Sequence, residues 1–361
     1  MRARILLFFC LAVLGYGIDQ VLVGWLDSPV RKVSEFGQDL VVCATGSQGL
    51  TAALGRNANG FFLQVFSGQG DRLFGPVPVE APVAPLRCLG WREDGQAVAI
   101  ASGHNVLVLE GPDWQMRRLK TDTLVREVAY RGHYLMARGT GNLHLWQASS
   151  LKVYWRLDQP YLLHSDVSRD GRWLATGCFE EGIRIFDLRT RRQALHFEQG
   201  LTPAGLDFCH QDQWLAACYR FRGRPNLDHA RLYEACSGKP VGPPLEEPGL
   251  RGYAVSRDGQ KVLIRSQARA TVFEPLSGRK LAQNPLDTRV IDSLSPDGRW
   301  AATTPPDCRV VVLWDTQNGQ VLANLSHPQA PTFIDWWSDR NLTVSGGSAA
   351  IWQLRPAGTK L

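Results

Sequence analysis

The chain has 361 residues, of which 44% are apolar and 20% are charged, and its formal net charge is +6. This composition is that of an ordered globular chain, and a charge of this size makes no continuous basic stripe, which argues against nucleic acid as a partner. The 35 glycines and 21 prolines are typical of a turn-dense all-β protein, and no long amphipathic helical pattern occurs.

Residues 1–19 differ from the rest of the chain. Residues 1–4 form a short positive segment, residues 5–14 are apolar throughout, and residues 15–17 offer small residues two positions apart. This three-part form predicts a secretory signal peptide and an exported protein, periplasmic or extracellular. The alternatives are an uncleaved anchor, which would associate with a membrane through residues 5–17, and a cytoplasmic chain. An anchor needs about 20 apolar residues, and Asp19 and Gln20 interrupt the run.

The sequence then repeats a short unit of strands and turns, with its clearest copy at residues 165–193. Here Arg169-Asp170-Gly171 predicts a tight turn, because Asp bonds to its own backbone and Gly tolerates positive φ. The same Ser-x-Asp-Gly turn begins at Ser256 and Ser295, and weaker versions occupy residues 93–95, 211–213 and 338–340. Residues 183–187 alternate apolar and polar, which indicates a half-buried strand.

One strand of each unit carries an aromatic or leucine anchor, and these anchors are Phe66, Leu109, Trp146, Phe186, Tyr233, Phe273, Trp314 and Trp352. A period of about 40 residues with four strands per unit is typical of a β-propeller. We therefore predict an all-β, eight-bladed propeller of four-stranded antiparallel blades, with seven blades as the alternative. The expected blades cover residues 28–82, 83–121, 122–159, 160–200, 201–249, 250–287, 288–329 and 330–357. Residues 47–60 and 219–230 are interpreted as insertions in blades 1 and 5.

The last unit supplies strands near residues 332–336, 342–344 and 350–353 and then lacks a fourth strand. Residues 20–27 have strand character and lie just before the first unit. We expect them to complete the last blade and close the ring, which removes the open edges of the sheet. One propeller domain over residues 20–357, with a tail at 358–361, follows from this hypothesis.

The units resemble WD-repeat (Trp-Asp repeat) propellers. Leu313-Trp314-Asp315 and Ile185-Phe186-Asp187 carry the resemblance, each downstream of a Ser-x-Asp-Gly turn, and it covers residues 20–357. The Gly-His dipeptide of that family has only a trace at Ser326-His327, so the family's hydrogen-bond network is not carried over. A quinoprotein-like or surface-layer propeller is the competing assignment. The resemblance implies a propeller scaffold for protein interaction.

The cysteines give no disulfide framework. The chain has eight, at positions 10, 43, 88, 178, 209, 218, 236 and 308, and removal of Cys10 with the signal segment would leave an odd number. Most occupy strand positions and are interpreted as small buried apolar residues. Cys209 and Cys218 flank one predicted hairpin and are the best candidates for a bridge.

No motif for catalysis or cofactor binding appears. The eight histidines are scattered without metal-ligand spacing, and the cluster of Cys209, His210 and Asp212 falls on a predicted turn, so no metal and no cofactor are expected. Nucleophile elbows and phosphate loops are absent. The function predicted is therefore a non-catalytic scaffold that binds a protein or peptide as a monomeric propeller. A propeller enzyme or a quinoprotein-like cofactor protein, with its site in the central channel, is one alternative, and a purely structural role in a larger envelope assembly is the other.

The candidate binding residues lie in the blade 5 insertion, and they are Tyr219, Arg220, Phe221, Arg222 and Arg224. Basic residues mixed with aromatic ones could hold an acidic peptide, a glycan or a phosphate. The plain alternative is a solvated loop, which is also how we interpret the basic run at residues 189–192. The rival site is the channel mouth, where Arg126, His164 and Asp292 begin inner strands.

Overall fold

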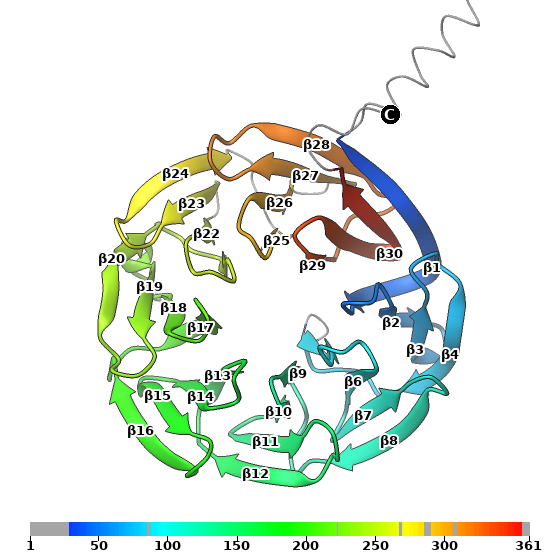
Figure 1. Cartoon of the computed structure of the whole chain (residues 1–361), viewed down its shortest axis with the longest axis horizontal. Coiled ribbons are helices and arrows are strands. Elements are labelled where there is room, and N and C mark those ends of the chain that lie inside the picture. The colour runs from blue at the N-terminus through cyan, green and yellow to red at the C-terminus, as the bar shows by residue number, and fades with distance from the viewer. Residues whose placement is uncertain are drawn as a thin grey trace, which may run out of the picture.

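The computed structural model describes residues 29–84, 87–221, 223–266, 269–284, 290–305 and 309–355, and its strands form a closed ring (Figure 1). These residues contain no α-helix, and none of their helical turns is long and apolar enough to cross a membrane. The prediction of an all-β fold is confirmed.

Six sheets have four antiparallel strands each, paired in chain order. Three of them are β5 (Leu89–Trp91), β6 (Ala97–Ser102), β7 (Asn105–Glu110) and β8 (Gln115–Lys120); β9 (Glu127–Arg131), β10 (Tyr134–Arg138), β11 (Asn142–Gln147) and β12 (Val153–Asp158); and β13 (Leu162–Val167), β14 (Trp173–Cys178), β15 (Gly182–Asp187) and β16 (Arg192–Phe197). The other three are β17 (Pro203–Cys209), β18 (Trp214–Tyr219), β19 (His229–Glu234) and β20 (Pro240–Glu246); β21 (Gly252–Val255), β22 (Val262–Arg265), β23 (Ala270–Glu274) and β24 (Arg279–Asn284); and β25 (Val290–Leu294), β26 (Trp300–Thr304), β27 (Val310–Asp315) and β28 (Val321–Ser326). These are blades 2 to 7.

The remaining sheet joins β29 (Phe333–Ser338), β30 (Asn341–Leu354), β1 (Val30–Thr45), β2 (Thr51–Asn57), β3 (Gly60–Phe66) and β4 (Arg72–Val79). The Leu354 amide donates to the Arg340 carbonyl at 2.8 Å, whereas a straight strand as long as β30 would hold its ends about 45 Å apart. β30 therefore folds back on itself, and its first part pairs with β29 while its second part pairs with β1.

β1 is divided in the same way. Gly37 and Asp39 have positive φ, residues before them pair with β30, and residues after them pair with β2. The joined sheet thus contains eight strand segments, which make two four-stranded blades, blade 8 and blade 1. Together with the other six sheets, the described residues form eight blades arranged in a ring (Figure 1).

The outer strand of blade 8 is formed by residues 30–36, which pair with residues 349–354. We predicted residues 20–27 for this position, and those residues lie outside the described ones. Val30 and Phe36 are buried there, while Arg31 and Lys32 between them are exposed. This pattern is interrupted by polar residues, which is why sequence reasoning preferred the more apolar segment ten residues earlier.

The interpretation of residues 47–60 as an insertion is wrong. Residues 51–57 are β2, a regular strand of blade 1, and its apolar side chains Ala52, Ala53 and Leu54 are fully buried on the faces of the sheet. Small residues give a weak strand pattern in sequence, although they fit the crowded interior of a blade.

The Ser-x-Asp-Gly turns have one geometry in blades 4, 6 and 7. The Ser Oγ donates to the Asp Oδ1 at 2.6 Å, and the same Oδ1 accepts the amide two residues on at 2.9–3.0 Å. The Ser Oγ also accepts the amide five residues on, which starts the second strand, at 2.8–3.0 Å. The glycines Gly171, Gly259 and Gly298 have φ of 67–71°, where other residues would be strained. The Ser, Asp and Gly that recur in these turns thus each satisfy one requirement of the turn.

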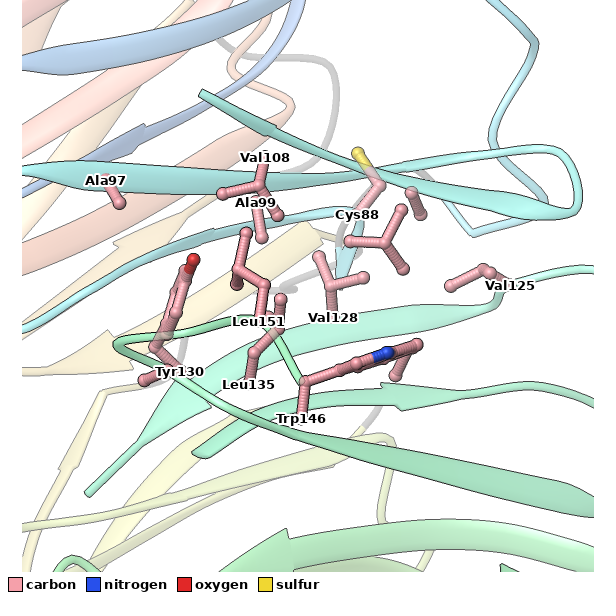
Figure 2. Packing of buried hydrophobic residues seen from close by; sticks show 14 of the residues in the cluster. Cys88, Ala97, Ala99, Val108, Val125, Val128, Tyr130, Leu135, Trp146 and Leu151 are labelled. Atoms are coloured by element: carbon pink, nitrogen blue, oxygen red, sulfur yellow. The ribbon is translucent and has the colours of Figure 1, made fainter. Parts of the chain in front are cut away.

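The core lies between the blades rather than in one centre. In Figure 2, Val108 and Ala99 of blade 2 face Val128, Leu135 and Trp146 of blade 3. All the predicted anchors are buried except Trp352, which is half-buried. Each blade therefore adds one apolar layer, as expected for a repeat fold.

The described cysteines are free thiols, and all but Cys236 are buried. Cys209 pairs with Trp214 at one end of the hairpin and Cys218 pairs with Gly205 at the other end. The candidate bridge between them is therefore wrong, because the two residues lie at opposite ends of β17 and β18. Burial raises the pKa of Cys43 to about 12 and that of Cys88 to about 12, which makes both thiols unreactive.

Candidate interaction site on one face of the ring

The ring has two faces that carry different connections. We call the loop face the one with the links from each outer strand to the next inner strand, for example residues 198–202, and with the links between second and third strands, for example residues 220–228. We call the turn face the opposite one, with the turns between first and second strands, for example residues 168–172 and 256–260. The predicted site lies on the loop face.

A cavity of about 810 Å³ opens on the loop face over blades 4, 5 and 6. Blade 4 contributes His164 and Phe179, blade 5 contributes Arg220 and Phe221, and the entry to blade 6 contributes Arg251. Two of the five predicted binding residues, Arg220 and Phe221, thus line one cavity with side chains from two neighbouring blades.

The other predicted residues lie elsewhere. Tyr219 is only 1% exposed, and its hydroxyl donates to Tyr233 at 3.3 Å within the core, so its ring is not available to a partner. Tyr219 was predicted as a binding residue, but its burial makes it part of the core. Arg224 is exposed on the same loop, and Arg222 lies outside the described residues.

The loop of residues 220–228 is fixed by a buried carboxylate. Asp228, which is 4% exposed, accepts the Phe221 amide at 2.7 Å, and the Gly249 amide donates to the Pro225 carbonyl at 3.1 Å. The Phe221 ring stacks on His229 with centroids 6.0 Å apart. These contacts hold Arg220 at the cavity without contacting its side chain.

Two cationic groups line the cavity, and neither has a partner among the described residues. Within the part of the chain that the structure describes, the side chains of Arg220 and Arg251 make no hydrogen bond or ion pair. Glu180 also lines the cavity, while Asp228 is occupied by the loop backbone. Two guanidinium groups are therefore available to an incoming anionic group.

Exposed apolar side chains lie around this cavity. Phe179 is 47% exposed and its amide donates to the carbonyl of Tyr161, which is itself 68% exposed. Leu227, in the blade 5 loop, is 43% exposed. Sequence reasoning missed Phe179, Tyr161 and Arg251. Phe179 and Tyr161 are aromatic residues at turn positions, and this pattern could have marked them as candidates for binding.

The residues predicted at the rival site, the channel mouth, do not lie together in the structure. His164 lines the cavity, while Arg126 is exposed outside it and donates to Thr140 at 3.0 Å. The side chain of Asp292 lies outside the described ones. Burial, together with Arg87 and Arg138, lowers the pKa of His164 to about 3, so its imidazole is neutral. The two predicted sites thus overlap at one residue, His164.

A charge network in blade 3 and at the entry to blade 2 acts on His164. Glu127 accepts from Arg138 at 2.7 Å and from Arg87 at 3.0 Å, so one carboxylate holds two guanidinium groups. Burial raises the pKa of Glu127, but the two arginines outweigh burial and the net pKa is below its ordinary value. The network stays ionised at neutral pH, and its two arginines lower the pKa of the neighbouring His164.

The described residues contain no group of three or more His, Cys, Asp or Glu side chains that could hold a metal ion. His210 stacks on Trp214 with centroids 3.9 Å apart and contacts the Asp258 carbonyl at 2.8 Å. Asp212 accepts the Asp170 amide at 2.9 Å. The turn of residues 209–212 is therefore held by its neighbours in a structural role.

The ring of four-stranded sheets makes this protein a β-propeller. No family model matches the chain, and no curated protein matches it. The crystal structure of BamB from Moraxella catarrhalis is similar, with a TM-score of 0.67 and 15% sequence identity, over 90% of this chain and 99% of that one. At this identity the likeness supports the propeller fold and nothing finer.

Proposed function

We propose that this chain is a non-catalytic propeller scaffold that binds a protein partner at the loop-face cavity. The observation that carries the proposal is the pair of unpartnered guanidinium groups, Arg220 and Arg251, beside the exposed ring of Phe179. Arginine and aromatic side chains dominate the energy of protein interfaces. The chemistry favours a partner segment with carboxylate side chains next to an apolar or aromatic anchor.

A charged contact and an apolar contact would together recognise the partner. A guanidinium group forms charge-assisted and often bidentate bonds to a carboxylate. The apolar anchor would cover Phe179 and Leu227, which otherwise remain in water. The structural likeness to BamB supports a propeller scaffold, while the partner is inferred from this cavity alone.

We also propose that residues 1–19 act as a signal peptide, so that the scaffold works outside the cytoplasm. Membrane association through residues 5–17 is the alternative. The N-terminal sequence and mass of the protein secreted from a bacterial host distinguish the two, because cleavage removes the segment and an anchor retains it.

The test uses a labelled peptide with glutamates on both sides of a leucine or phenylalanine, measured by fluorescence anisotropy. Replacement of Arg220 and Arg251 with Ser should weaken binding at least tenfold, and Phe179→Ala should weaken it as well. Added salt should reduce the effect of the arginine changes, since exposed charges are screened over about 10 Å at 0.1 M.

Two matched controls sharpen the test. A peptide with glutamine in place of glutamate should bind weakly, and a variant with Arg189 and Arg192 changed to Ser, in an exposed turn of blade 4, should bind like the unaltered chain. Arg126→Ser tests the neighbouring channel rim. Equal loss in the Arg189 and Arg192 variant would reject the cavity as the site, and loss only in Arg126→Ser would move the site to the channel.

A further inference from the structure

A second cavity, of about 700 Å³, opens on the turn face beside the inner strands. The ends of the inner strands and the turns that follow them line it, and Arg131, Arg169 and Arg257 contribute three guanidinium groups. Arg131 forms an ion pair with Asp166 at 3.2 Å. The other two arginines need a separate explanation.

Arg169 and Arg257 occupy the same place in the Ser-x-Asp-Gly turn of blades 4 and 6, the second position. The turn requires Ser, Asp and Gly for its hydrogen bonds and its positive φ, but it does not restrict the second side chain. Blade 7 has Pro296 at that position, with the same turn geometry. The turn itself therefore does not account for either arginine.

Neither of these two side chains has a hydrogen bond or an ion pair with any described residue. Burial and the positive charges of Arg257 and Arg131 lower the pKa of Arg169, and Glu93 and Asp212 offset this only in part. Arg169 and Arg257 thus repel each other at this point of the cavity, and a bound anion would reduce this repulsion.

Six aspartates also line this cavity, and three of them, Asp212, Asp258 and Asp297, are held by the turns. Asp258 and Asp297 each accept a turn hydroxyl and a turn amide through Oδ1, and Asp212 accepts the Asp170 amide through Oδ2. Asp207 accepts from the Tyr253 hydroxyl of the next blade, and Asp339 is exposed at the rim. None of these carboxylates forms an ion pair with Arg169 or Arg257.

The two arginines stand on a rigid support. Between them, the blade 5 turn bonds to both neighbours: Asp212 accepts the amide of Asp170, and the His210 amide donates to the Arg257 carbonyl at 2.9 Å. His210, Gln211 and Asp212 all have positive φ, of 52–65°, which is costly for residues other than glycine. A strained segment kept in place by its contacts fixes the relative position of the turns on either side.

We infer that Arg169 and Arg257 form a site for a doubly charged oxyanion, either a phosphate group or a dicarboxylate, in the turn-face cavity. Planar guanidinium groups suit such oxygens because they donate two parallel hydrogen bonds. The site is separate from the loop-face cavity, since it lies on the other face of the ring.

Isothermal titration calorimetry with inorganic phosphate and with succinate, at constant ionic strength, tests this inference. Saturable binding is expected for at least one of the two dianions, with acetate much weaker, and the two arms distinguish phosphate from dicarboxylate. Arg169→Gln and Arg257→Gln should each weaken binding at least tenfold, because one guanidinium group cannot replace two.

Arg172→Gln is the matched control. Arg172 belongs to the same turn as Arg169, but its guanidinium lies over the Trp173 ring at 4.5 Å. This change should leave dianion binding unaltered, as should Arg220→Ser on the loop face, and thermal melting checks that each variant is folded. Absence of saturable binding, or equal weakening by Arg172→Gln, would overturn the inference. Failure of peptide binding at the loop face would not affect it, since the probes and variants differ.

Discussion

Blades 4 and 5 are neighbours with the same strand order, yet they differ at both ends. Blade 4 has a short link between its second and third strands, residues 179–181, and a regular Ser-x-Asp-Gly turn. Blade 5 has a long link, residues 220–228, and a turn with three consecutive residues of positive φ. The strands between these ends are paired alike and pack against each other.

The comparison distinguishes the paired strands, which build the ring, from the links and turns, which vary between blades. Blade 4 satisfies each turn requirement with a dedicated residue, so its conformation follows from local chemistry. Blade 5 depends on neighbours, because Asp212 and His210 bond to the turns of blades 4 and 6. Both cavities lie over this irregular blade, which fits the general location of binding residues on loops above a rigid scaffold.

The largest expected effect comes from the residue that joins the blade 5 core to its loop. Tyr219→Ala should lower the free energy of unfolding by about 3–5 kcal/mol, since it removes a fully buried aromatic ring. Arg220→Ala, one residue later and exposed, should change it by less than about 0.5 kcal/mol. Urea unfolding followed by tryptophan fluorescence measures both, and an unchanged midpoint for Tyr219→Ala would restore that side chain as a candidate binding residue.

Most of the ring could be predicted from sequence because its determinants are local. The Ser-Asp-Gly turns and the anchors Phe186 and Trp314 recur at a fixed spacing, and each copy reports the same strand and turn. The identity of the closing strand could not be found in this way. Residues 30–36 are held by pairing with residues 349–354, far away in sequence, and their polar pattern is outweighed by this long-range contact.

The candidate site was predictable only in part. The mixture of arginine and aromatic residues at 219–224 drew attention to a loop that lines a cavity, but sequence could not show that Tyr219 faces the core while Arg220 faces the cavity. Successive residues at a strand end point in opposite directions, and the strand end was uncertain by that one residue. Phe179 and Arg251 belong to other blades, so only the closed ring brings them beside the loop.

A smaller effect is expected from a feature that blades 4, 5 and 8 share, an aspartate in the inner strand that contacts the next blade. Asp166 accepts the Phe208 amide at 2.8 Å, and Asp335 accepts the Thr45 amide at 2.9 Å. Burial raises the pKa of Asp166 to about 6 and that of Asp335 to about 6, despite these bonds. At neutral pH these contacts between blades therefore contain ionised carboxylates, and burial makes their ionised form unfavourable.

The sign of the pH effect follows from these pKa values. Between about pH 4 and 6 the folded chain holds protons on these carboxyls that the unfolded chain has released, so their contribution to the free energy of unfolding falls as pH rises. Asp335→Asn should raise the free energy of unfolding by about 1–2 kcal/mol at pH 7.5 and change it little at pH 4.5, because an amide oxygen still accepts from Thr45. Urea unfolding at the two pH values measures this, and a variant that is destabilised equally at both would show that the ionised carboxylate is needed.

The last pair of effects concerns the two turns themselves; the effects should have opposite signs, and the second of them is the smallest expected. Gly171 has a φ of 70° in the regular blade 4 turn, and a Cβ there would lie 3.3 Å from the Tyr134 ring, so Gly171→Ala should cost about 1–2 kcal/mol.

Gln211 has a φ of 54° in the blade 5 turn, and Gln211→Gly should relieve a similar strain. The added freedom of glycine in the unfolded chain offsets about 0.5–1 kcal/mol of this gain, which leaves a net stabilisation of about 0.5 kcal/mol. Paired urea titrations can resolve the opposite shifts in midpoint. Destabilisation by Gln211→Gly would mean that the Gln211 side chain contributes to the turn, and that the two blades are stabilised more alike than their backbones indicate.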